Sequence, residues 1–221
     1  MYFPFMLYND KIDHKPVFTE LQGDPYVADL SPASPLLTGI DMRDQERFQK
    51  ILDEKMGRTY RWGFSPYLER RDTLLGTCPQ MVADQRFIHL GLDIIVGLGT
   101  PLHAPLEAMV TESGYESGEG NYGGFVLLKH EGRHFETFYS FYGHLCIDRL
   151  PRVGTFYTAG SVFAEIGDFH ENGHWFHHTH LQVITQSGLE KGYLSKGYCS
   201  QADLAEMNAL CPSPIPLFRR V

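Results

Sequence analysis

The 221-residue chain lacks any long apolar run, since no segment approaches the roughly 20 apolar residues that a membrane-spanning helix needs. Its apolar N-terminal stretch has neither a basic lead nor a small-residue cleavage site, and so matches a signal peptide poorly. The chain also lacks a basic surplus: its formal net charge is −8, whereas nucleic acids and anionic membranes are bound through basic faces. We therefore expect a cytoplasmic protein whose main partner is neither a nucleic acid nor a membrane.

Cysteine is sparse and scattered. The chain has four cysteines and no Cys-x-x-Cys pair; they are Cys78, Cys146, Cys199 and Cys211. Because a chain of this length can bury a core without disulfides, we expect reduced, buried thiols. Hydrophobic residues make up 43% of the sequence, which is typical of a globular protein and excludes a disordered or fibrous one. Histidine is the one residue type with an unusual count, 11 in all.

From about Phe87, short runs of β-branched and aromatic residues alternate with glycines. This pattern predicts strands over 94–96, 125–128, 137–142, 161–166 and 181–185. No helical periodicity interrupts them, which predicts an antiparallel core. The expected fold class is therefore mainly β: an antiparallel sheet or sandwich with a short N-terminal helix and a C-terminal helix.

The expected organisation has three parts: an extension over 1–86 that packs on the core, a β domain over 87–190, and a tail over 191–221. Residues 1–40 carry several prolines and are interpreted as a loop-rich lead. Helical spacing of apolar residues predicts a helix over 41–56, ended by Gly57. A loop with short strands is predicted over 58–86, and a tail helix over 202–210 with Ser200 as its N-cap.

Three histidine clusters fall inside the β region. In the first, His89-Leu-Gly-Leu-Asp93, a straight strand would separate His89 and Asp93 by about 13 Å at ~3.3 Å per residue. One zinc ion needs its ligand atoms about 2.0–2.2 Å away, so the chain must bend between them. Gly91 permits such a bend.

The second cluster is the pair His178 and His180, which strand parity places on one face, so that two imidazoles approach one point. The third is His144, at the end of an aromatic strand. A lone histidine in a strand is more often a core or surface residue than a ligand. Three clusters in one β region, however, predict a metal site.

These motifs resemble, in order and spacing, those of the lysostaphin-type zinc metallopeptidases. The resemblance runs over about residues 87–185 and rests on His89-Leu-Gly-Leu-Asp93-Ile with the trailing Gly99-Thr-Pro, the glycine-led strand over 120–130, Tyr142-Gly-His144-Leu and His178-Thr-His180-Leu. It implies that His89, Asp93 and His180 bind Zn²⁺ and that His144 and His178 are the catalytic pair. Three protein ligands leave a fourth position for water, as expected of a catalytic zinc.

The resemblance further implies a hydrolase that cleaves a peptide (amide) bond with metal-activated water, acting on a peptide substrate. Where the family usually has Pro-His-Leu-His-Phe, this chain has His177 and Thr179 around the pair, which puts the local geometry in question but not the ligands. The acidic net charge opposes binding to anionic wall polymers, so an intracellular peptide is a hypothesis beside a peptidoglycan-derived one. No sequence signal indicates an oligomeric state.

Other interpretations stay open. Residues 170–174, His-Glu-Asn-Gly-His, formally match the zincin motif, although Asn-Gly indicates a turn and glycine costs about 1 kcal/mol inside a helix. A cupin would need a carboxylate where Ile184 and Thr185 stand. A non-catalytic zinc-binding module of the same fold is a third alternative. Tyr60-Arg61-Trp62 and Arg70-Arg71 could line a substrate groove, but a solvated loop is the favoured interpretation for both.

Overall fold

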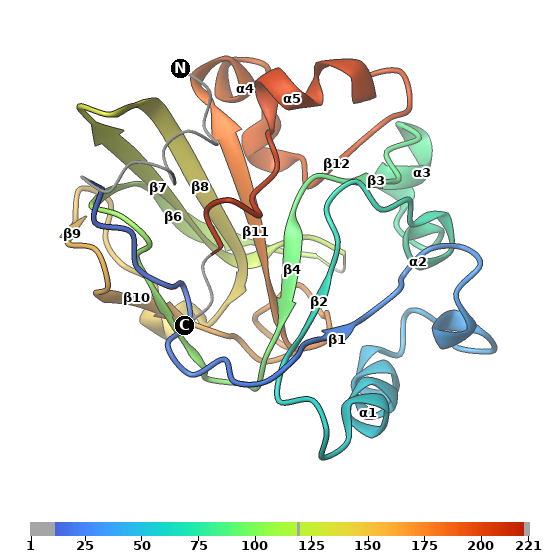
Figure 1. Cartoon of the computed structure of the whole chain (residues 1–221). Helices are drawn as coiled ribbons and strands as arrows, with labels where there is room; N and C mark the ends of the chain where they lie inside the picture. Colours follow the sequence, from blue (N-terminus) through green and yellow to red (C-terminus); the bar gives the residue numbers. More distant parts are fainter. Residues whose placement is uncertain (1–11, 119, 219–221) are drawn as a thin grey trace.

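The computed structural model describes residues 12–118 and 120–218 (Figure 1). Its centre is an eight-stranded sheet in the order β1-β2-β4-β11-β8-β7-β6-β9. All neighbouring strands in this sheet are antiparallel except β1 and β2, which are parallel. Two further pairs, β5 with β10 and β3 with β12, lie beside the main sheet. The prediction of a mainly β fold is confirmed.

The strands are β1 Tyr26–Val27, β2 Gly63–Ser65, β3 Ile88–His89, β4 Leu92–Ile95, β5 Pro101–His103, β6 Ala108–Glu116, β7 Gly123–Gly132, β8 Phe135–Leu145, β9 Phe156–Tyr157, β10 Val162–Glu165, β11 His178–Thr185 and β12 Tyr198–Cys199. The α-helices are α1 Gln45–Met56, α2 Asp72–Leu75, α3 Pro79–Ala83, α4 Gln186–Glu190 and α5 Met207–Leu210. Turns of 3₁₀-helix cover Pro35–Leu37, Ile147–Arg149, Tyr193–Ser195 and Leu204–Glu206.

Strand β11 lies between β4 and β8 and is buried on both faces. Leu181 and Val183 pack into the apolar cluster on one face of the sheet, whereas Ile184 packs into a separate cluster with Phe141. Because side chains alternate along a strand, His178, His180 and Gln182 share the face of Ile184. The central strand therefore carries polar side chains into the interior on one side of the sheet.

Helix α1 confirms the predicted N-terminal helix, although it begins at Gln45 rather than residue 41. The side chain of Asp44 accepts a hydrogen bond from the amide of Arg47, and Gly57 ends the helix with a positive φ of 53°. The buried side chains of Phe48 and Leu52 attach the helix to the protein. Figure 1 shows α1 near the β1 end of the sheet, with α4 and α5 near the end of β11.

Two predictions on the flanks are wrong in part. Residues 58–86 contain the helices α2 and α3 besides β2, and each of these helices is too short to show a helical repeat in the sequence. In the tail, turns and a 3₁₀ turn precede α5, which starts only at Met207, so there is no continuous helix over 202–210. Ser200 nevertheless accepts a hydrogen bond from the amide of Asp203, 3.3 Å long, as a capping residue would.

The predicted lead over 1–40 lies partly outside the described residues, which begin at 12. Within the described part, Val17 and Phe18 are buried in the same apolar cluster as Leu181, and β1 forms one edge of the sheet. The three-part division of the chain stays a prediction. Across the described ranges the four cysteines are not joined by disulfides, and no helix there is long and apolar enough to cross a membrane.

Candidate metal and catalytic site

The sheet register brings the first group of predicted residues together. His180 on β11 pairs with Asp93 on β4, and Asp93 pairs on its other side with Ser65 on β2. His89 ends β3, and the chain turns between β3 and β4, as the required bend predicts. Gly91 has a second role there, because a Cβ at this position would lie 2.4 Å from Cε1 of His180. The glycine therefore leaves the space that the imidazole fills.

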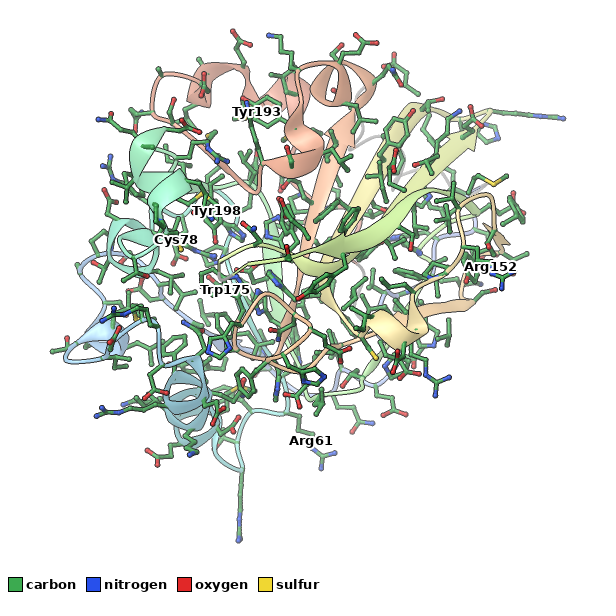
Figure 2. The ribbon with its side chains drawn as sticks, turned by 180° about the vertical axis from the view of Figure 1, so that it is seen from behind. Arg61, Cys78, Arg152, Trp175, Tyr193 and Tyr198 are labelled. Atoms are coloured by element: carbon green, nitrogen blue, oxygen red, sulfur yellow. The ribbon has the colours of Figure 1, made fainter. Side chains whose placement is uncertain are left out.

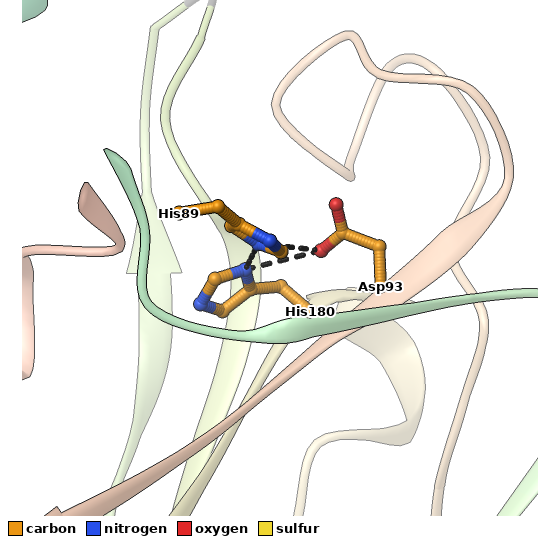
Figure 3. Close-up of side chains that lie close together, drawn as sticks. All are labelled: His89, Asp93 and His180. Atoms are coloured by element: carbon orange, nitrogen blue, oxygen red, sulfur yellow. Dashed lines mark hydrogen bonds and ion pairs between the residues drawn. The ribbon is translucent and has the colours of Figure 1, made fainter. Parts of the chain in front are cut away.

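The ligand atoms of His89, Asp93 and His180 converge (Figure 3). Nε2 of His89 lies 3.0 Å from Nδ1 of His180 and 3.1 Å from Oδ1 of Asp93, and the distance from Nδ1 of His180 to Oδ1 of Asp93 is 3.2 Å. A tetrahedral zinc ion with bonds of about 2.0–2.1 Å holds its ligand atoms about 3.3–3.4 Å apart. The spacing of the three atoms therefore fits a zinc ion.

Hydrogen bonds fix the tautomers of both histidines. Nδ1 of His89 donates to the carbonyl of Pro66 at 3.0 Å, which leaves a lone pair on Nε2. Nε2 of His180 donates to Oε1 of Gln182 at 3.0 Å, and the Gln182 amide nitrogen in turn donates to the carbonyl of Lys196. In these neutral tautomers the lone pairs of Nε2 of His89 and Nδ1 of His180 face Oδ1 of Asp93, an arrangement that a cation stabilises.

Burial and charge set the protonation of His89 and Asp93, which are at most 2% exposed. Burial, together with the Arg71 charge, lowers the pKa of His89 to about 3. Burial by itself would raise the pKa of Asp93, but His89 and Arg71 hold that pKa well below its usual value. At neutral pH the imidazole of His89 is neutral and Asp93 is ionised, as metal ligands must be.

Arg71 corrects the expectation of a solvated loop, because its side chain is only 1% exposed. Its Nη1 donates to Oδ2 of Asp93 at 2.6 Å and its Nε donates to Oε2 of Glu69 at 2.8 Å. Its neighbour Arg70 does follow the expectation, since its side chain is 56% exposed and pairs with Asp72. No local pattern in the sequence distinguishes the two arginines. The sequence therefore offered Arg71 only as a possible groove residue and did not reveal its contact with Asp93.

His144 and His178, the predicted catalytic pair, lie beside the three-residue group. Their ring centroids are 4.3 Å apart, and Nε2 of His178 lies 3.7 Å from Oδ1 of Asp93. Nδ1 of His144 donates to the carbonyl of Asn172 and Nδ1 of His178 to that of Phe176, both at 2.7 Å. Each histidine is therefore oriented with an unprotonated Nε2.

The backbone of His144 has a positive φ of 65°, which is uncommon for a residue with a side chain. Its amide donates to the carbonyl of Tyr122, and its carbonyl accepts from the amide of Gly167, so neighbouring loops hold this conformation on both sides. A left-handed non-glycine residue costs roughly 1–2 kcal/mol. Such strain is concentrated at functional sites in proteins.

Both members of the pair are neutral at physiological pH. Burial lowers the pKa of His178 to about 4. Burial, followed by the proximity of His178, lowers the pKa of His144 well below its usual value. Two neutral imidazoles with a free Nε2 can accept a proton from a water molecule or a substrate.

A cavity of about 400 Å³ opens onto these groups. Figure 2 labels two of its lining residues, Trp175 and Tyr198. Polar residues from outside the sheet, among them Gln80 and Asn121, also line the cavity. The lining residues that bear most on the chemistry are Arg71, Arg86, Asp93, Glu116, Tyr122, His144, Trp175, His178, His180 and Tyr198. Four of the five predicted site residues therefore face one cavity.

The zincin interpretation requires a helix over 170–174, and the chain forms turns there. Both carboxylate oxygens of Glu171 accept backbone amide hydrogens, from Ile147 at 2.9 Å and from Asp168 at 3.1 Å. The side chain of His170 is 77% exposed. Glu171 thus orders loops, and the predicted Asn-Gly turn is present, with Gly173 at a φ of 81°.

The two unusual residues around the histidine pair have local partners. Thr179 donates its hydroxyl hydrogen to the carbonyl of Gly143 at 3.0 Å, on the face opposite to the site. The imidazole of His177 lies 3.2 Å from a carboxylate oxygen of Asp168. Both substitutions are accommodated without displacing His178 or His180 from the site face.

No family model matches the sequence, and no curated protein matches it. Among solved structures, the antimicrobial peptidase lysostaphin from Staphylococcus simulans is similar at 20% identity and a TM-score of 0.40, over 59% of this chain and 43% of that chain. A zinc-containing peptidase from Vibrio cholerae is similar at 20% identity and a TM-score of 0.37, over 45% of this chain and 28% of the other. Csd3 from Helicobacter pylori gives 23% identity, a TM-score of 0.38, and coverages of 56% and 29%. The chain thus spans less than half of each of these structures, and the likeness is distant.

Proposed function

We propose that the chain is a zinc-dependent hydrolase that cleaves a peptide bond, as a lysostaphin-like endopeptidase does. The observation that supports this most directly is the convergence of three possible ligand atoms, 3.0 to 3.2 Å apart, beside the histidine pair at one cavity. A purely structural zinc site is usually closed by four protein ligands, whereas a site with three leaves a position open.

His89, Asp93 and His180 are the residues that would hold the metal. Zinc bound there would supply a Lewis acid that activates water and polarises an amide carbonyl. The site is preorganised for a metal. Pro66 and Gln182 hold the imidazoles of His89 and His180 in the required tautomers, and Arg71 keeps Asp93 ionised. Such preorganisation spares the protein a rearrangement during the reaction.

His144 and His178 carry out the proton transfers in this proposal. A neutral imidazole takes a proton from the attacking water at Nε2 and, once charged, stabilises the oxyanion of the tetrahedral intermediate. The same nitrogen then returns the proton to the leaving amine. Main-chain carbonyls at Asn172 and Phe176 keep each ring oriented, because they bind Nδ1–H throughout.

The substrate in this proposal is a peptide, either intracellular or derived from peptidoglycan. The cavity of about 400 Å³ suits a few peptide residues rather than a folded protein. The net charge of −8 disfavours binding to intact anionic wall polymers. Activity on intact cell walls at physiological salt would contradict the intracellular option.

The proposal is tested by incubating the zinc-loaded protein with a mixed peptide library and detecting new termini by mass spectrometry. We expect cleavage that a chelator abolishes and added zinc restores. The His178→Ala variant should bind zinc without cleaving. Stoichiometric zinc in the wild-type protein with no cleavage of any library peptide would contradict the hydrolase and favour a non-catalytic zinc-binding module.

A further inference from the structure

We propose that Arg71 is a positioning residue for the metal site, which restricts Asp93 to binding a metal through one oxygen only. This inference rests on the proposed function, since it concerns the metal that His89, Asp93 and His180 would hold. It adds a residue from outside the β domain predicted over 87–190. Arg71 lies between β2 and α2, in the segment expected to be a loop with short strands.

The two carboxylate oxygens of Asp93 have different neighbours. Its Oδ1 faces both histidines, 3.1 Å from Nε2 of His89 and 3.2 Å from Nδ1 of His180. Its Oδ2 accepts the hydrogen bond from Nη1 of Arg71 at 2.6 Å. A metal ion between the histidines would therefore meet Oδ1, while Oδ2 is engaged by the guanidinium.

The guanidinium is itself held on every side that the structure describes. Nε donates to Glu69, Nη2 donates to the hydroxyl of Ser65, and Nη1 also lies 3.2 Å from the Tyr198 hydroxyl. Ser65 donates to Oε2 of Glu69, and Oε1 of Glu69 accepts from the amide of Leu30. The planar fork of an arginine can serve these separate acceptors at once, whereas the ammonium of a lysine is a point charge on a flexible stem.

Because the network is buried, the loss of any one partner is costly. The side chains of Arg71, Asp93 and Glu69 are 1%, 2% and 8% exposed, so water does not compensate a missing partner. Removing one member of a buried ionic network leaves another charge unpaired, which is strongly unfavourable. One arginine beside two carboxylates leaves one negative charge in excess, which a divalent cation at the histidines would offset.

The consequence concerns coordination number. With Oδ2 bound to Arg71, Asp93 supplies one ligand atom, and with His89 and His180 the protein supplies three. The fourth tetrahedral position then stays open for water. Without Arg71 the carboxylate could rotate and bind through both oxygens, which would fill that position. Hydrogen-bond partners of metal ligands generally orient those ligands and tune the metal site.

The test compares Arg71→Lys, which keeps the charge, with the matched control Arg70→Lys, whose side chain pairs with Asp72 at the surface. Zinc affinity is measured by competition with a chromophoric chelator at fixed pH, and circular dichroism with a cooperative unfolding curve verifies the fold. We expect zinc binding to weaken by roughly 10- to 100-fold in Arg71→Lys, as for other partners of metal ligands. The affinity of Arg70→Lys should equal that of the wild type.

A second readout reports geometry instead of affinity. The wild-type protein loaded with cobalt(II) should show the intense visible absorption of a four-coordinate site, and Arg71→Lys should show the weaker absorption of a higher coordination number. If Arg71→Lys does not fold, Ser65→Ala serves instead. This variant removes one hydrogen-bond acceptor of the guanidinium and retains the charges of Arg71, Glu69 and Asp93. It should weaken zinc binding in the same direction.

Wild-type zinc affinity together with a wild-type cobalt spectrum in the folded variant would overturn the inference. That result would show that a positive charge at residue 71 is sufficient for zinc binding, and that the planar guanidinium of Arg71 does not position Asp93. It differs from a failure of the proposed function, in which the wild-type protein itself would bind no zinc.

Discussion

The imidazoles of His144 and His178 lie with their centroids 4.3 Å apart, and each donates Nδ1–H to a main-chain carbonyl. The two residues come from different strands, β8 and β11, and His144 reaches its position through a left-handed backbone. Since burial lowers both pKa values, the pair offers two unprotonated Nε2 atoms at neutral pH.

Replacing either histidine of the pair should separate catalysis from metal binding. In His144→Ala and His178→Ala we expect peptide cleavage to fall by about 10²- to 10⁴-fold, because a general acid–base is lost, while zinc stoichiometry is unchanged. Cleavage is followed by mass spectrometry and zinc by metal analysis. His170→Ala, at a 77% exposed side chain, is the control and should behave as wild type. Full activity in both pair variants would contradict their catalytic role.

Gly91 should tolerate no side chain, because a Cβ there would lie 2.4 Å from the ring of His180. We expect Gly91→Ala to displace that ring, to weaken zinc binding and to reduce the free energy of unfolding by about 1–3 kcal/mol. Gly97→Ala is the matched control, since its nearest neighbour outside the adjacent residues is Oγ1 of Thr100 at 3.8 Å. Denaturant unfolding and chelator competition measure both effects. Equal behaviour of the two variants would show that Gly91 does not set the position of His180.

Features that depend on local spacing could be predicted from the sequence. Strand parity placed His178 and His180 on one face, Asn172-Gly173 predicted a turn, and the apolar repeat predicted α1. Features that depend on long-range register could not. Arg71 reaches Asp93 only because β2 pairs with β4, and the tautomer of His180 depends on Gln182 and the carbonyl of Lys196.

The short elements were missed for a related reason. The helices α2, α3 and α4 have four or five residues each, about one turn, so they show no repeat that the sequence could reveal. Strand β6 was also not predicted, because its residues Thr111, Glu112 and Ser113 interrupt the apolar pattern. Tertiary contacts, rather than local propensity, determine such elements.

His130 should make the stability of the protein depend on pH, independently of the metal site. The residue is fully buried, with Nδ1 donating to the carbonyl of Glu107 and Nε2 2.7 Å from the Ser140 hydroxyl. Burial lowers its pKa to about 4, from 6.5 in the unfolded chain. Between these two values the unfolded state binds more protons, so stability is complete above pH 6.5 and is lost as the pH falls toward 4.

The measurement is the difference in unfolding free energy between the wild type and His130→Gln, from denaturant titrations between pH 7 and pH 4. This difference should shrink by about 3 kcal/mol across that window. His134→Gln, in the turn between β7 and β8, is the control and should leave the pH dependence of the wild type intact. A difference that stays constant over the window would contradict the buried neutral state of His130.

Glu171→Gln should spare catalysis. The carboxylate of Glu171 accepts two backbone amide hydrogens and orders the loops at Ile147 and Asp168, so we expect a loss of stability of about 1 kcal/mol with cleavage largely retained. A zincin would need this glutamate as its general base. Loss of cleavage by a folded, zinc-loaded Glu171→Gln protein would therefore support the zincin interpretation over the present one.

The assignment of His89, Asp93 and His180 as ligands of one zinc ion underlies the proposed hydrolase. Its most direct test is metal analysis of the purified wild-type protein and of His180→Ala after equilibrium dialysis against buffered zinc. We expect about one zinc ion per chain in the wild type and none retained by the variant, since two remaining ligands hold zinc poorly. A wild-type protein without zinc, or a folded His180→Ala protein that keeps it, would contradict the claim.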